Sequence, residues 1–191
     1  KVIAVGNEAM VHWAASYFVK PVVILGWVNY LQTLKANGDL PKELWITSSD
    51  NFASWGGGGS EYHNEDLVQL AKAVDYVSMH TYPFHDTHYN PSFWNIEAVK
   101  TYKDTNDVNS LLMKSAVNYS KMQYKQVSDY LKSIGVDKPI HIGETGWASK
   151  SDGFYGPDGS KAADELKQSM YHQGMREWTD TEGISCFYFE A

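Results

Sequence analysis

The sequence predicts an α/β fold built on a parallel β-sheet. Five short apolar runs of β-forming residues alternate with four longer segments whose apolar residues recur at helical spacing. Helices of this length between consecutive strands imply right-handed crossovers, and therefore parallel strands. The sheet is either an open, doubly wound one or part of a (β/α)8 barrel.

The first half of the chain predicts three strands and two helices. The strands are residues 2–5, 44–47 and 74–82. The helices are marked by Val23, Trp27, Tyr30, Leu31 and Leu34, and then by Leu67, Leu70, Ala71 and Val74. Asn37-Gly38 ends the first helix, because glycine is favoured just beyond a helix. The polar residues 48–60 are predicted to be a loop, with Gly56 to Gly59 as its flexible rim.

The second half begins with a polar segment and continues with two helices and two strands in alternation. Residues 83–115 are too long for an ordinary connection, so we expect a functional loop or an insertion there. The next helix is marked by Val127, Tyr130, Leu131 and Ile134, before Gly135. The remaining elements are a strand at 140–144, a helix marked by Leu166, Met170, Tyr171 and Trp178, and a strand at 184–189.

The length bears on which of the two sheets is present. A full barrel takes about 250 residues, so a barrel requires roughly three βα units before Lys1. Both ends of the chain lie in predicted strands and look cut inside a fold. We therefore expect residues 1–191 to be a partial domain whose partner is the missing N-terminal half of the barrel.

Composition excludes several classes of function. The net charge is -7 and basic residues form no block, so nucleic acid is not an expected partner. A membrane span is not expected either, because no apolar run approaches the ~18 to 20 residues that it needs. The single cysteine, Cys186, is predicted to be a buried, inert thiol. His80, His85 and His88 are expected to make loop hydrogen bonds or to contact a substrate, and neither metal nor cofactor is predicted.

Polar and aromatic side chains follow each predicted strand, where parallel α/β folds gather their reactive groups. Besides Glu8 and Glu144, the candidates that bind a substrate are Asn7, Asp50, Asn51, Trp55, Tyr82, Trp147 and Glu190. Cleavage of a glycosidic bond needs one carboxyl group to protonate the leaving oxygen and another to attack or to activate water. Glu8 and Glu144 are the candidate pair.

The supporting residues suit the same chemistry. Asn7 carries an amide that can donate to a sugar 2-hydroxyl, and Tyr82 can orient the nucleophile. Trp55 and Trp147 can stack on pyranose rings. A single Glu at a strand end is usually a solvated loop residue, but two of them three strands apart would face one barrel mouth. Trp13, Trp27, Trp45 and Trp178 follow helix or strand periods and are predicted to be core residues.

The motifs resemble those of glycoside hydrolase family 17, the β-1,3-glucanases and related transglycosylases. The matching strings are Val5-Gly6-Asn7-Glu8, Thr47 to Asp50, Tyr82-Pro83-Phe84, Gly143-Glu144-Thr145-Gly146-Trp147 and Phe187-Tyr188-Phe189-Glu190-Ala191. The resemblance implies about strands 4 to 8 of a (β/α)8 TIM barrel. It also implies Glu8 as acid/base and Glu144 as nucleophile of a retaining endo-β-1,3-glucanase that acts on laminarin-type glucans outside the cell, in the periplasm or at the cell surface.

Two other functions stay open. A β-1,3-glucan transglycosylase would use the same two glutamates and pass the glycosyl unit to a sugar hydroxyl instead of water. A non-catalytic carbohydrate-binding protein would use the Trp and Tyr side chains alone. The second alternative is disfavoured because binding does not need paired carboxylates.

Overall fold

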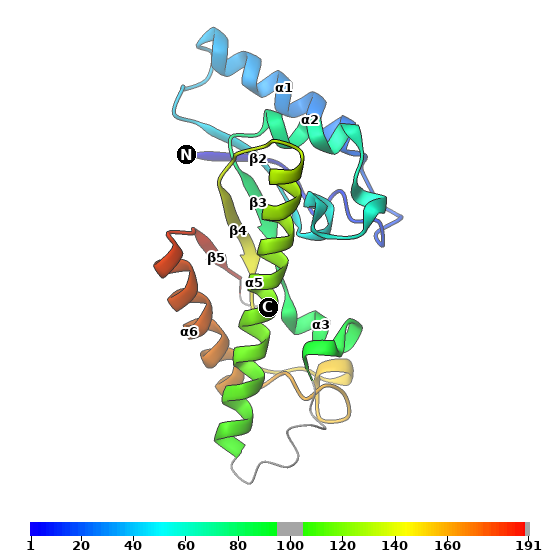
Figure 1. Cartoon of the computed structure of the whole chain (residues 1–191), viewed down its shortest axis with the longest axis vertical. Helices are drawn as coiled ribbons and strands as arrows, with labels where there is room; N and C mark the ends of the chain where they lie inside the picture. Colours follow the sequence, from blue (N-terminus) through cyan, green and yellow to red (C-terminus); the bar gives the residue numbers. More distant parts are fainter. Residues whose placement is uncertain (95–104, 190–191) are drawn as a thin grey trace. The chain divides into compact units, whose positions relative to one another are not determined.

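A computed structural model describes residues 1–94 and 105–189, in two compact units (Figure 1). The first unit comprises Lys1–His80 and Gln123–Gly143, and the second comprises Thr81–Met122 and the segment from Glu144 onward. Strand β4 (Ile140–Thr145) and helix α5 (Thr105–Ser133) run from one unit into the other. Along the sheet, the strand order is β1-β2-β3-β4-β5, the order of the sequence.

Parallel strands form the centre of the first unit. Strand β1 (Val2–Asn7) pairs with β2 (Trp45–Asn51), and β2 pairs with β3 (Val77–His80). The next strand, β4, continues the sheet, because the Val77 amide donates to the Pro139 carbonyl at 2.9 Å. Ile46, Val77, Met79 and Ile142 are buried along these strands. The predicted alternation of strands and helices is confirmed here.

Two helices accompany the strands of the first unit. Helix α1 (Pro21–Asn37) begins at a proline, which lacks the amide hydrogen that a first turn leaves unpaired, and ends at Gly38, whose φ is 85°. In helix α2 (Glu65–Ala73), the Asn64 side chain caps the start by accepting from the Leu67 amide at 3.0 Å. Helices α1 and α2 contact each other.

The connection after β2 differs from the predicted flexible rim. Strand β2 extends to Asn51, and the chain then turns tightly through Ala53–Gly57 and Ser60–Tyr62. Gly56 is buried with φ at 88°, and a Cβ there would lie 2.1 Å from the Tyr130 ring. This segment is therefore packed against α5, and the glycine is needed for its backbone conformation and for the close approach.

The second unit holds the remaining helices and the last strand. Its elements are α3 (Pro83–Tyr89), the short turns Pro91–Phe93 and Gly153–Tyr155, α6 (Glu165–Glu182) and β5 (Cys186–Tyr188). The Phe189 amide donates to the Thr145 carbonyl at 2.7 Å, which joins the end of β4 to the β5 segment. Trp147, Tyr171 and Met175 are the most deeply buried large side chains of this unit.

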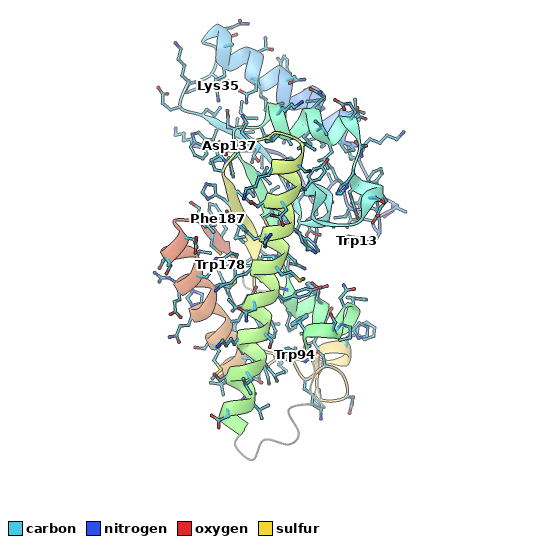
Figure 2. The ribbon with its side chains drawn as sticks, viewed as in Figure 1. Trp13, Lys35, Trp94, Asp137, Trp178 and Phe187 are labelled. Atoms are coloured by element: carbon cyan, nitrogen blue, oxygen red, sulfur yellow. The ribbon has the colours of Figure 1, made fainter. Side chains whose placement is uncertain are left out.

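Two predictions about elements need correction. Helix α5 begins at Thr105, about twenty residues before Val127, the first residue that marks the predicted helix, because its first turns carry polar residues that hide the helical period. The region 83–115 is thus mostly helical where it is described, and residues 95–104 lie outside the described part. Trp13, Trp27 and Trp45 are 64%, 59% and 43% exposed, so the predicted core position is wrong for these three. Trp178 is 8% exposed and is a core residue as predicted. Figure 2 labels Trp13 and Trp178.

Helix α1 explains part of that error. Its buried side chains are Ile24 and Val28, one turn apart, and they pack toward the unit's interior. Val23 and Trp27 form a second apolar pair with the same spacing, on an exposed side of the helix. The period identifies the helix correctly, but it does not tell which of two apolar stripes is buried.

Candidate active site

The backbone turns abruptly at Glu8, directly after β1. Glu8 has φ at 46°, in the left-handed region that residues other than glycine rarely adopt. The register between β1 and β2 shifts between Ala4 and Asn7, and the Glu8 amide donates to the Ser49 carbonyl at 2.9 Å. Such a conformation costs roughly 1–3 kcal/mol and is typical of functional sites. Its effect is to end the strand with a carboxylate held at the sheet edge.

A line of polar side chains connects Glu8 to the interior of the first unit. His80 Nδ1 lies 3.2 Å from Glu8 Oε1, and His80 Nε2 lies 2.6 Å from Ser49 Oγ. Ser49 Oγ lies 2.9 Å from Ser78 Oγ. The His80 side chain is fully buried, while the Glu8 side chain is 39% exposed. Sequence reasoning identified Glu8 but missed this line, although His80, Ser49 and Ser78 all stand on predicted strands or strand ends.

Asp50 and Asn51 organise loops, and Asp50 cannot bind a substrate as predicted. Asp50 is fully buried and accepts hydrogen bonds from the amides of Met10 at 2.8 Å and Asn51 at 2.9 Å. Burial raises the pKa of Asp50, and these hydrogen bonds partly offset the rise. The Asn51 side chain accepts from the Ala53 amide at 3.0 Å and shapes the turn after β2. Asn7 is exposed at the end of β1, so its role toward a sugar stays a prediction.

In the second unit, Glu144 has a specific partner. The Tyr82 hydroxyl donates to Glu144 Oε2 at 2.9 Å, and both residues are partly exposed. The Thr81 amide donates to the Glu144 carbonyl at 3.0 Å, so the backbone is fixed as well. The predicted contact between Tyr82 and Glu144 is present.

Behind Glu144 lies a buried network of hydroxyl groups. Tyr171, fully buried on α6, has its hydroxyl 2.7 Å from Thr145 Oγ1 and 3.0 Å from Ser120 Oγ. The Thr81 hydroxyl donates to Ser120 Oγ at 3.2 Å. Burial raises the pKa of Tyr171, which keeps the phenol neutral. These hydrogen bonds connect the ends of β3 and β4 to helices α5 and α6. No sequence motif predicted the network.

The two tryptophans predicted to stack on sugar rings are core residues. Trp55 is 0% exposed and its indole donates to the Ser78 carbonyl at 2.9 Å. Trp147 is 1% exposed, donates to the Ala162 carbonyl at 2.9 Å and packs against Tyr171. Enclosed rings cannot contact a ligand, so this prediction is wrong for both. The strand-end position was read correctly, but each ring turns back into its own unit.

Four other residues named in the sequence analysis are two histidines, the cysteine and Glu190. His85 makes a hydrogen bond, but from helix α3 and not from a loop, because its Nδ1 lies 3.0 Å from the Tyr155 hydroxyl. His88 stacks on Phe154 with 4.0 Å between ring centroids. Cys186 is half-buried, and burial raises its pKa to about 11, so its thiol is a poor nucleophile at neutral pH. Glu190 lies outside the described residues.

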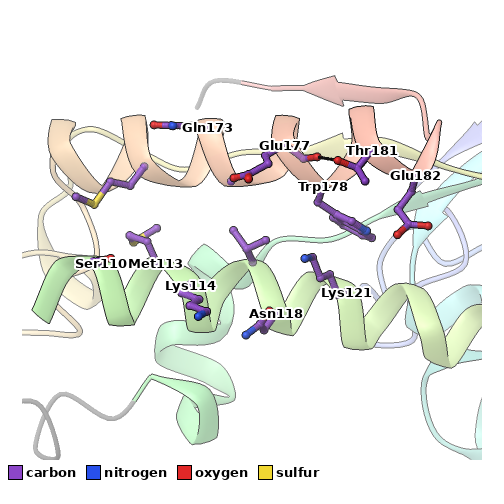
Figure 3. Close-up of a pocket in the computed structure, with 13 residues that line it drawn as sticks. Ser110, Met113, Lys114, Asn118, Lys121, Gln173, Glu177, Trp178, Thr181 and Glu182 are labelled. Atoms are coloured by element: carbon purple, nitrogen blue, oxygen red, sulfur yellow. Dashed lines mark hydrogen bonds between the residues drawn. The ribbon is translucent and has the colours of Figure 1, made fainter. Parts of the chain in front are cut away.

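A groove between α5 and α6 is separate from these residues (Figure 3). It has a volume of about 590 Å³, and Met113, Val117 and Met170 contribute apolar side chains to its lining. Lys121 Nζ lies 5.8 Å from the centroid of the Trp178 ring. The groove contains none of the predicted site residues, and we attribute it to the packing of the two helices.

The fold and the strand-end residues define a class of protein. The strands of the sheet alternate with helices, and partly exposed carboxylates with hydrogen-bond partners follow β1 and lie near the end of β4, which is where a (β/α)8 enzyme places its functional groups. The described helices include none that is long and apolar enough to cross a bilayer.

Comparison with solved structures agrees with this class. An endo-laminarinase from Formosa Hel1_33_131 matches 100% of the chain with 60% sequence identity and a TM-score of 0.95, and the chain spans 49% of that enzyme. An active-site mutant of the β-1,3-glucanosyltransferase of Rhizomucor miehei, in complex with laminaritriose, matches 98% of the chain with 18% identity and a TM-score of 0.62. The chain covers 52% of that protein, and this second match shows the fold alone.

No protein-family model matches the chain, and neither does any curated protein. The match to the endo-laminarinase nevertheless confirms the resemblance seen in the motifs and the partial barrel fold. Over its whole length, the chain is therefore similar to about half of an endo-laminarinase.

Proposed function

We propose that this chain carries both catalytic carboxylates of a retaining endo-β-1,3-glucanase that hydrolyses laminarin-type glucans. The observation that carries the proposal is 60% identity to an endo-laminarinase over the whole chain. Residues 1–191 form about strands 4 to 8 of the barrel, and the other half of the barrel completes the cleft. The enzyme acts outside the cell, in the periplasm or at the cell surface, where polysaccharides are met.

Glu144 is the nucleophile. Its hydrogen bond from Tyr82 holds the carboxylate in one orientation, which a nucleophile needs because the attacking oxygen must meet the anomeric carbon in line. The backbone on either side is fixed by the pairing of Thr81 with Glu144 and of Phe189 with Thr145. A carboxylate on a rigid strand end is more accurately placed than one on a loop.

Glu8 is the acid/base. Its side chain is partly exposed, so a glycosidic oxygen or a water molecule can reach it, while His80 fixes one carboxyl oxygen from the buried side. The backbone at Glu8 has φ at 46°, and β1 ends directly before it. A proton donor needs this combination of access and orientation.

The reaction then proceeds in two displacements. Glu144 attacks the anomeric carbon, the bond to the leaving oxygen breaks, and Glu8 gives that oxygen its proton. In the second step, Glu8 takes a proton from water, the water oxygen attacks the anomeric carbon, and the bond to Glu144 breaks. Asn7, next to Glu8, donates to the 2-hydroxyl of the same sugar. The product keeps the β configuration.

A transglycosylase is the second candidate function. The fold is shared with a protein named as a β-1,3-glucanosyltransferase, and a sugar hydroxyl in place of water leaves every other step unchanged. Incubation of the full-length protein with laminarin oligosaccharides, followed by chromatography of the products, tests both. Shorter products alone support hydrolysis, products longer than the substrate support transfer, and an unchanged substrate contradicts both.

A further inference from the structure

His80 has no role in the two displacement steps described above. Its imidazole is fully buried, yet both ring nitrogens have polar partners in the first unit, Glu8 Oε1 at 3.2 Å and Ser49 Oγ at 2.6 Å. A buried histidine with a hydrogen bond on each nitrogen has a fixed ring orientation. The question is what the fixed ring does for the carboxyl group in front of it.

We propose that His80 is a positioning residue for Glu8, and that Ser49 and Ser78 keep its imidazole as a neutral donor toward that carboxyl group. The inference rests on the proposed role of Glu8 as acid/base.

The hydrogen-bond chemistry of the line leads to this assignment. An ionised carboxylate only accepts, so Nδ1 must carry a proton whenever Glu8 is ionised. Nε2 is then an acceptor in the neutral ring, and the Ser49 hydroxyl can donate to it. Because the Ser49 hydroxyl hydrogen is directed to Nε2, Ser49 Oγ accepts a hydrogen bond from Ser78 Oγ, which lies 2.9 Å away. The order of donors runs from Ser78 through Ser49 and His80 to Glu8.

This arrangement suits a group that changes protonation state twice in each cycle. The Nδ1–H group can donate a hydrogen bond to Glu8 Oε1 when the carboxyl group is ionised, and also when Oε1 is the carbonyl oxygen of the protonated acid. Glu8 therefore keeps one orientation throughout, with its other oxygen directed to the leaving group or to water. Without the serine hydroxyls, either ring nitrogen can carry the proton, and the donor to Glu8 is lost in part of the molecules.

The backbone holds the line in place. Ser49 pairs with Ser78, and Asn51 pairs with His80, in the parallel register of β2 and β3. From the neighbouring strand β4, Gly143 covers the serines so closely that a Cβ there would lie 2.2 Å from Ser78 Oγ and 2.5 Å from Ser49 Oγ. The serine pair thus explains why the residue before Glu144 is glycine.

Two carboxyl groups of the first unit interact with His80. Glu8 faces it from the end of β1, and Asp50 on β2 interacts with it electrostatically. Glu144 follows Gly143 on β4. These three carboxyl groups can each contribute to a pH profile. All three are present in the wild type and in the serine variants below, so a difference between their profiles does not come from the loss of a carboxyl group.

The test compares Ser49→Ala, Ser78→Ala and His80→Asn in the full-length protein, with Ser133→Ala as the matched control. Ser133 carries a hydroxyl group of the same unit that donates within α5, to the Tyr130 carbonyl at 2.6 Å. Two substrates are used, a laminarin oligosaccharide and a laminaribioside with a dinitrophenyl leaving group. The second substrate needs no proton from Glu8 for bond cleavage, so its kcat/KM is insensitive to that role.

We expect Ser49→Ala to lower kcat/KM for the oligosaccharide roughly tenfold, and to leave kcat/KM for the dinitrophenyl substrate within about twofold. The alkaline limb of the oligosaccharide pH profile should move, because it reports the proton on the acid. Ser78→Ala should have a smaller effect of the same kind, and Ser133→Ala none. An equal loss for both substrates, or an unmoved alkaline limb, overturns the proposal.

Two further results separate this inference from the proposed function. If Glu8→Gln retains hydrolysis of the oligosaccharide, the role of Glu8 fails, and the inference fails with it. If Glu8→Gln is inactive while Ser49→Ala and His80→Asn both behave as wild type, only the role of His80 fails. Thermal unfolding shows whether each variant is folded. If His80→Asn does not fold, the result for Ser49→Ala alone decides whether His80 has the proposed role.

Discussion

The hydroxyl group of Tyr82 donates a hydrogen bond of 2.9 Å to Oε2 of Glu144. Tyr82 immediately precedes α3, and Glu144 lies near the end of β4, so two separate strand ends converge on this contact. The pairing of Thr81 with Glu144 through the backbone brings them together. The phenol is thus a fixed donor for one oxygen of the proposed nucleophile.

Replacement of Tyr82 with phenylalanine removes that donor and keeps the ring. We expect kcat to fall roughly 10- to 100-fold, which corresponds to one lost hydrogen bond to a charged group. KM should change little, because the ring still fills the same space. Steady-state kinetics on laminarin measure both, with Tyr17→Phe, at a tyrosine that is 58% exposed, as the control. A kcat equal to that of the control would contradict the role.

The two glutamates should be separable by chemical rescue. Glu8→Gln and Glu144→Gln should each lower hydrolysis of laminarin by several orders of magnitude, with Glu43→Gln, an exposed glutamate, unaffected. Azide with an activated substrate should then distinguish a Glu144→Gly variant, which yields the inverted glycosyl azide, from Glu8→Ala, which yields the retained one. The reason is that azide replaces the nucleophile in one case and water in the other. The reverse assignment of products would exchange the two roles.

The sequence determined the elements and the acidic strand ends but not the directions of the large side chains. Runs such as 140–144 and the helical period before Gly38 suffice to place strands and helices, because each reports a local preference. Whether Trp55 points to a ligand or into the core depends on residues far along the chain, in this case the Ser78 carbonyl. Local patterns cannot contain that information.

The same limit explains what was missed around Glu8. Ser49, Ser78 and His80 are separated by about thirty residues at most and meet only through the register of β2 and β3. A motif search weighs each residue with its immediate neighbours, and there a serine in a strand carries little meaning. The register shift before Asn7 involves the pairing of β1 with β2, and the Gly-Asn-Glu string alone does not report it.

Two glycine substitutions should change stability in opposite directions. Gly56→Ala places a Cβ 2.1 Å from the Tyr130 ring at a φ of 88°, so we expect a loss of about 2 kcal/mol or more. Gly26→Ala lies inside α1 with open space around it, and should gain about 0.5–1 kcal/mol through helix propensity. Denaturant unfolding of the full-length protein measures both. Equal changes in the two variants would contradict the packing of Gly56 against α5.

The ion pair between Lys35 and Asp75 should make stability depend on pH in the acid range. Burial would raise the pKa of Asp75, but hydrogen bonds from the Lys35 ammonium at 2.7 Å and the Ile46 amide at 2.8 Å outweigh it and lower the pKa below the ordinary value of an aspartate. An acid whose folded pKa is depressed stabilises the fold above its unfolded pKa and loses that contribution as pH falls through the folded value. The cost of Asp75→Asn should therefore be full at pH 6 and shrink below about pH 4. Asp39→Asn, at an exposed site, serves as the control, and a cost that does not vary with pH would contradict the linkage.

The last prediction concerns the distance between the two carboxyl groups in the complete barrel. A retaining glycosidase keeps them roughly 5 to 5.5 Å apart, since the nucleophile itself must reach the anomeric carbon, whereas an inverting enzyme leaves about 6.5 to 9.5 Å for a water molecule. A crystal structure of the full-length enzyme should place Glu8 and Glu144 in the shorter range. Proton NMR of the first minutes of laminarin hydrolysis gives an independent reading, because a double displacement releases the β-anomer before mutarotation. An α-anomer as first product, or carboxyl groups more than about 6.5 Å apart, would rule out the double displacement and with it the role of Glu144 as nucleophile.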